Sequence, residues 1–297
     1  MKSKISFFNR TIFKKNITQY WPVWSIYLFF LLIFWPFNIW QTMKVIIDTE
    51  TSHESLSYYS VFSAVSIGIE PIVIAIAAVV VAAFLFSYLY TARNTNMIHA
   101  LPVTRFELFV TNYVSGLVFL IGSQTIAFLI GVLVCVGLKI TCIQYLFYGF
   151  MYAAGMAFFF YSMAVFVAMF TGNRMALLAY YFIINMLYVG VVYLLANFQA
   201  MVCYGQVETI SPGKLEVLSP LFYLERYVSV SVNHDEMGQV FGLYMNGGFA
   251  IGMYAVAGIV FAAGACLLYR KRNLETAGDL VSIGVIKPIF RWGVALC

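Results

Sequence analysis

The chain has 297 residues, of which 63% are hydrophobic and only 10% are charged. A water-soluble domain carries roughly 25% charged residues, so this composition excludes a soluble globular protein. The formal net charge of +5 does not indicate nucleic-acid binding, because the basic residues are not gathered on one soluble element with interleaved aromatic and base-reading side chains. The composition therefore predicts an integral membrane protein.

The first 19 residues are basic and lack the compact apolar core and small-residue cleavage site of a secretory signal. Ile5, Phe8 and Ile12 recur at helical spacing, which predicts a helix in the membrane interface, held by apolar burial and by anionic lipid. The same basic residues also fit a plain positively charged topology anchor. We assign residues 1–19 to an N-terminal interfacial segment and leave both interpretations open.

Six stretches are long and apolar enough to span a bilayer, whose core of about 30 Å requires about 20 residues of helix. They are Tyr20–Trp40, Ser66–Tyr88, Phe106–Leu138, Gln144–Phe170, Met175–Phe198 and Gly247–Tyr269. The predicted fold class is an all-α integral membrane protein with six transmembrane helices in residues 20–269 and a cytoplasmic tail in residues 270–297.

The distribution of Lys and Arg predicts that both ends of the chain are cytoplasmic, because cytoplasmic loops are enriched in these residues. With the N-terminus inside, thirteen of the 17 basic residues fall on the inner side and four on the outer side. The outer four are Lys44, Lys139, Lys214 and Arg226. We therefore expect a multi-pass protein of the plasma membrane.

Two longer connections are expected outside, Gln41–Val65 and Gln199–Asn246. In the second, Ser219 followed by Pro220 is a typical helix start. The apolar residues after it recur at helical spacing, at Leu221, Leu224 and Val228. This pattern predicts a short outer helix between spans five and six, resting on or dipping into the outer leaflet.

Motifs for catalysis or for a cofactor are absent from the sequence, which contains neither a G-x-x-x-x-G-K-[ST] phosphate-binding loop nor H-E-x-x-H. The five cysteines form no C-x-x-C pair, so we expect no metal site. Cys142 and Cys203 both fall outside, either as a disulfide or as free thiols. Glu70 is the ionisable residue that stands out within a span, and Pro71 after it indicates a helix start near the outer surface. We interpret Glu70 as a first-turn carboxylate favoured by the helix dipole rather than as a functional intramembrane group.

The connection between spans two and three carries an apolar surface pattern. Thr104 and Glu107 form a capping box, which predicts that a helix begins at Arg105, while Pro102 prevents one continuous helix from span two. Residues 94–101 can form one or two turns along the membrane surface. The apolar residues of this segment, Met97, Ile98 and Leu101, would then have to be covered by lipid or by a partner protein.

Residues 94–105, NTNMIHALPVTR, resemble the coupling region of firmicute permease subunits of ABC-2 type ABC transporters, and residues 269–279, YRKRNLETAGD, resemble the segment after their sixth helix. The resemblance implies a permease subunit without ATPase activity of its own. It would pair with a second permease subunit, identical or related, and with cytoplasmic ABC ATPase subunits. Similar chains often continue into a second membrane half, whereas this sequence ends at Cys297.

The resemblance also implies roles for particular residues. Met97, Ile98 and Leu101 would be apolar contacts to the ATPase, with His99 and Arg105 as the polar rim. Residues 270–272 would anchor the sixth helix to anionic membrane lipids. The exported cargo would be an amphipathic drug, a peptide or a lipid. The rival hypothesis is a membrane sensor or immunity-type protein that binds a peptide or lipid at its outer loops without an ATPase, and a third, disfavoured by the missing motifs, is a small intramembrane enzyme.

Overall fold

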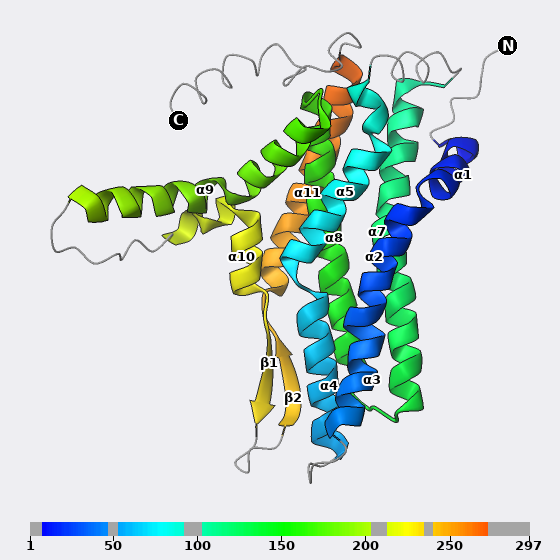
Figure 1. Cartoon of the computed structure of the whole chain (residues 1–297), viewed down its shortest axis with the longest axis vertical. Coiled ribbons are helices and arrows are strands. Elements are labelled where there is room, and N and C mark those ends of the chain that lie inside the picture. The colour runs from blue at the N-terminus through cyan, green and yellow to red at the C-terminus, as the bar shows by residue number, and fades with distance from the viewer. Residues whose placement is uncertain (1–7, 47–52, 92–102, 203–212, 235–239, 273–297) are drawn as a thin grey trace.

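A computed structural model describes residues 8–46, 53–91, 103–202, 213–234 and 240–272 (Figure 1). Within these ranges, five helical stretches are long and apolar enough to cross a membrane: Trp21–Lys44, Arg105–Gly137, Ile143–Phe170, Arg174–Val202 and Gly248–Lys271. If the bent helix pair Glu54–Gly68 and Pro71–Leu85 counts as one further span, the number of candidate spans rises to six. The predicted fold class of a helical multi-pass membrane protein is therefore confirmed, and the bent pair lies where the second span was expected.

The first span is interrupted by a short π-helix. It consists of α2 (Trp21–Leu32), the π-helix η1 (Ile33–Phe37) and α3 (Asn38–Ile46). Pro36 lies inside η1, where its missing N–H and bulky ring disturb the regular helical hydrogen bonds. The helix continues to Ile46, so the predicted end at Trp40 was wrong by six residues.

The second span begins earlier than predicted. The structure has α4 (His53–Gly68), α5 (Pro71–Leu85) and the 3₁₀ turn η2 (Ser87–Tyr90), whereas the sequence pattern indicated a loop up to Val65. The polar character of α4 hid the helix, because Ser55, Ser57 and Ser60 are buried within the protein. The chain bends by 43° between α4 and α5, since Pro71 cannot donate the hydrogen bond that would continue α4.

The irregular segments of the first two spans pack against each other. A side chain at Gly68, the last residue of α4, would overlap the indole ring of Trp35 in η1. Trp35 is only 1% exposed, so the glycine is what allows this close approach.

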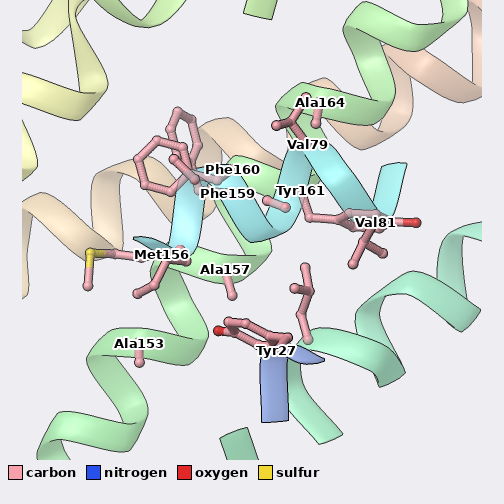
Figure 2. Packing of buried hydrophobic residues seen from close by; sticks show 14 of the residues in the cluster. Tyr27, Val79, Val81, Ala153, Met156, Ala157, Phe159, Phe160, Tyr161 and Ala164 are labelled. Atoms are coloured by element: carbon pink, nitrogen blue, oxygen red, sulfur yellow. The ribbon is translucent and has the colours of Figure 1, made fainter. Parts of the chain in front are cut away.

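Helix α8 (Ile143–Phe170) is the centre of the bundle and packs against α5, α7 (Arg105–Gly137) and α11 (Gly248–Lys271). The most apolar part of α8 is 78% buried, against 33% or less for the other four single helices. Figure 2 shows Tyr27 from α2 next to Ala157 of α8, and Val79 from α5 next to Ala164 of α8. A shift of α8 would therefore alter its packing against α5, α7 and α11.

Helix α9 (Arg174–Val202) bends away from the bundle (Figure 1). Its first half is held by Leu177 and by Tyr181, whose hydroxyl donates to Ala75 O at 3.1 Å. In the middle of α9, Val189 N donates to Ser219 Oγ at 3.1 Å. A side chain inserted into the backbone hydrogen bonds of a helix is a common cause of kinks.

The connection between α9 and α11 contains the turn η3 (Gly213–Leu218), α10 (Pro220–Tyr227) and a β-hairpin of β1 (Val230–His234) and β2 (Val240–Met245). The short helix predicted from Ser219 and Pro220 is present, with Leu221 and Leu224 buried against the protein. The antiparallel hairpin pairs Val230 with Met245 and was not predicted. It is the β-structure found in the described ranges.

Candidate functional site

The proposed partner-binding residues belong to the connection between η2 and α7. Met97, Ile98, His99 and Leu101 lie outside the described residues, and Arg105 is the first residue of α7. The elements on both sides of this connection are described. The end of η2 and the start of α7 lie at one end of the bundle, together with the ends of α8 and α11 and the start of α9 (Figure 1).

The capping residue expected before α7 is in place. The Thr104 hydroxyl accepts a hydrogen bond from Glu107 N at 3.2 Å, so the helix begins at Arg105 as predicted. The Glu107 carboxylate lies towards the N-terminal segment, where Oε1 accepts from Asn9 Nδ2 at 3.4 Å.

Arg105 is exposed and reaches the last turn of α11. Its Nη1 donates to Arg272 O at 3.2 Å and to Arg270 O at 3.5 Å. Carbonyl groups at a helix C-terminus lack intrahelical donors and carry partial negative charge, so a guanidinium there is favourable. Besides any contact with a partner, Arg105 therefore joins the start of α7 to the end of α11.

Arg272, the residue after α11, is 6% exposed. Its Nη1 donates to Ala168 O at 3.0 Å and Met169 O at 2.9 Å, near the end of α8. Its Nη2 donates to Leu89 O at 3.1 Å, in η2. The expected lipid contact is therefore wrong for this side chain, because the guanidinium points into the protein and is satisfied there.

The charge of Arg272 is balanced by dipoles. The ion pair found in the described part of the chain joins Arg226 to Glu216 at 3.3 Å and does not involve Arg272. Burial lowers the pKa of Arg272 from its ordinary value, while neighbouring tyrosine hydroxyls act in the opposite direction. Arginine stays protonated in proteins, so a buried positive charge rests against the carbonyl ends of α8 and η2.

Aromatic contacts support the same junction. Tyr88 in η2 donates to the Tyr269 hydroxyl of α11 at 3.1 Å, and the Tyr269 ring lies 5.6 Å from that of Phe109 in α7. We call Arg105, Arg272 and their carbonyl acceptors the arginine clamp. It connects η2, the start of α7 and the ends of α8 and α11.

The N-terminal helix α1 (Arg10–Gln19) is held to α7 by polar contacts. Asn16 Nδ2 donates to Asn112 Oδ1 at 2.8 Å and to Ser115 Oγ at 3.1 Å. Of the predicted apolar stripe, Ile5 lies outside the described residues, Phe8 is 39% exposed and Ile12 is partly buried. The exposed face is basic, with Arg10, Lys14 and Lys15.

Two further sequence interpretations can be compared with the structure. Glu70 occupies the N-cap position of α5, in agreement with a carboxylate near a helix N-terminus, but it lies at the break within the second span and not at its outer end. Cys142 is buried, at 2% exposure. Its suggested partner Cys203 is outside the described residues, so this pairing stays untested.

Two hollows differ in character. An apolar groove of about 290 Å³ lies between α2 and α5 and is lined by Tyr27, Phe30 and Phe34 from one side and by Val73, Ile76 and Val80 from the other. A polar hollow lies along the exposed basic face of α1. In the part of the chain that the structure describes, no group of three His, Cys, Asp or Glu side chains could hold a metal ion.

Comparison of the chain with protein-family models, with curated proteins and with solved structures finds no match.

Proposed function

We propose that the chain is the membrane-spanning permease subunit of an ATP-driven ABC transporter of the ABC-2 type, energised by a separate cytoplasmic ATPase. The observation that carries the proposal is how the elements on both sides of residues 94–105 are attached to the bundle. This segment, which resembles a coupling region, connects two elements that the arginine clamp ties to the ends of α8 and α11. A segment that transmits a displacement from a partner to the spans must be attached to those spans at both of its ends, and the arginine clamp provides such attachment.

The architecture around this segment also supports the proposal. A short helix precedes the spans, and α10 packs between α9, α5 and α11. In the proposed complex, ATP-driven closure of the ATPases displaces the segment between η2 and α7, and a pair of permease subunits alternates between inward and outward access. Apolar surfaces such as the groove between α2 and α5 suit an amphipathic drug, peptide or lipid as cargo.

A second candidate function is peptide or lipid binding at the opposite end without transport. The observation that favours it is the ordered structure there, where β1 and β2 pack against α4 and Ser55 Oγ donates to Val240 O at 3.5 Å. A sensor or immunity-type protein would use this surface and would have no ATPase partner.

Met97→Glu and Ile98→Glu separate the two functions. A carboxylate buried without a partner at an interface costs several kcal/mol, so either change should abolish co-purification of the ATPase while membrane insertion stays intact. Glu225→Gln, on the exposed face of α10, is the control and should leave the association unchanged.

The unmodified chain should retain an ATPase from membranes and should show no ATP hydrolysis when purified away from it, since it lacks a phosphate-binding loop. Retention of the ATPase at full level by both charged variants would exclude this segment as the contact. Absence of any ATPase partner for the unmodified chain would favour the sensor.

A further inference from the structure

The Arg272 side chain makes hydrogen bonds to two segments that are distant from it in the sequence. Its acceptors are Ala168 O and Met169 O at the end of α8 and Leu89 O in η2, at 2.9–3.1 Å. A guanidinium presents its donors in a rigid planar fork, unlike the single flexible ammonium of lysine. The bonds therefore fix where η2 lies relative to the end of α8.

Arg105 completes the connection from the other direction. Its bonds to the carbonyls of Arg270 and Arg272 join the start of α7 to the end of α11, from which Arg272 extends. The arginine clamp thus links the corresponding ends of four spans, those that contain α5, α7, α8 and α11.

Simple packing does not explain Arg272. A buried positive charge loses its hydration, and an apolar side chain of similar volume would fill the same space without that cost. What the guanidinium adds is a set of directional bonds between segments. The α8 end could also be capped by a side chain of its own or by a lysine, since one charge near the last carbonyls is enough for capping.

We infer that Arg272 is a positioning residue that makes η2 and the ends of α7, α8 and α11 move as one body. For the identity of the cytoplasmic partner, the inference rests on the proposed function. A displacement that the partner imposes on η2 or α7 then reaches α8 directly. Because α8 is the central helix and its 28 residues extend about 42 Å at 1.5 Å per residue, the movement is carried to the far end of the bundle.

The test places a reporter at that far end. Gln144, exposed in the first turn of α8, is replaced by cysteine in a background without the native cysteines and is labelled with an environment-sensitive fluorophore. In the complex with the ATPase, ATP with orthovanadate should change the fluorescence. Arg272→Gln and Arg272→Lys should both lose this change while the ATPase still co-purifies at the unmodified level.

Lys271→Gln is the matched control, because it removes one positive charge from the adjacent exposed position. It should keep the signal. Arg272→Lys retains the charge but not the fork, so a normal signal in this variant would overturn the inference and leave Arg272 as a simple cap. Loss of folded protein in both Arg272 variants, but not in Lys271→Gln, would likewise assign a purely structural role.

A second measurement keeps the inference separate from the proposed function. In the chain without any partner, Arg272→Gln should raise hydrogen exchange at the end of α8 and in η2 together, whereas Lys271→Gln should not. Unchanged exchange at either segment would overturn the inference. Failure of the unmodified chain to bind any ATPase would contradict only the proposed function.

Discussion

Gly68→Ala tests the contact between the irregular segments of the first two spans. A Cβ at this position would overlap Nε1, Cδ1 and Cε2 of Trp35, whose side chain is 1% exposed. The indole ring or the end of α4 must therefore shift to admit the methyl group. Inserting a methyl group into a filled core costs about 1–3 kcal/mol, which is the expected loss of unfolding free energy.

The partner of this contact provides a double-mutant cycle. Trp35→Leu removes the ring atoms that a Cβ at Gly68 would meet, at a cost of about 3 kcal/mol for the lost packing. Trp35 Nε1 has no hydrogen-bond partner among the residues described, so the change loses volume and no polar contact. In this background Gly68→Ala should be nearly neutral, giving a coupling energy of about 1–3 kcal/mol.

The assay follows the unfolding of purified protein in detergent by the reaction of buried thiols with a fluorogenic reagent. Cys135 and Cys142, at 0% and 2% exposure, should become reactive only on unfolding. Gly252→Ala is the control, because a Cβ there meets no atom within 4 Å and alanine favours the helix. Equal costs of Gly68→Ala in both backgrounds, or a cost no greater than that of Gly252→Ala, would refute this packing.

Two more predictions address topology and the N-terminal helix. Single cysteines at Ser52 and Asn233 should react with an impermeant thiol reagent from outside intact cells and one at Asn273 should not, because the distribution of basic residues predicts that both chain ends are inside. Labelling at Asn273 would contradict the predicted topology. Asn16→Leu removes two hydrogen bonds to α7, to Asn112 Oδ1 and Ser115 Oγ, at about 1–3 kcal/mol, so hydrogen exchange in α1 should rise. Lys15→Gln, on the exposed face, should leave the exchange unchanged, and an equal rise in both variants would contradict the polar attachment of α1 to α7.

The sequence alone determined the features that depend on local chemistry or on the solvent. A bilayer requires about 20 contiguous apolar residues per span, and this requirement is visible without any knowledge of packing. The helix starts at Arg105 and Pro220 were also predictable, because Thr104 and the Ser219–Pro220 pair are local signals. Of the candidate site, Arg105 could be placed at the start of α7 from these signals.

Only the tertiary structure decided which polar residues face protein. In the sequence, Ser55 of α4 looks like part of a loop and Arg272 like part of a lipid anchor, yet both are buried. Distant segments supply their hydrogen-bond acceptors, β2 for Ser55 and the end of α8 and η2 for Arg272. The same holds for Asn16, which attaches α1 to α7. A polar side chain can be buried when a partner from a distant segment satisfies it, and a pattern of neighbouring residues carries no information about that partner.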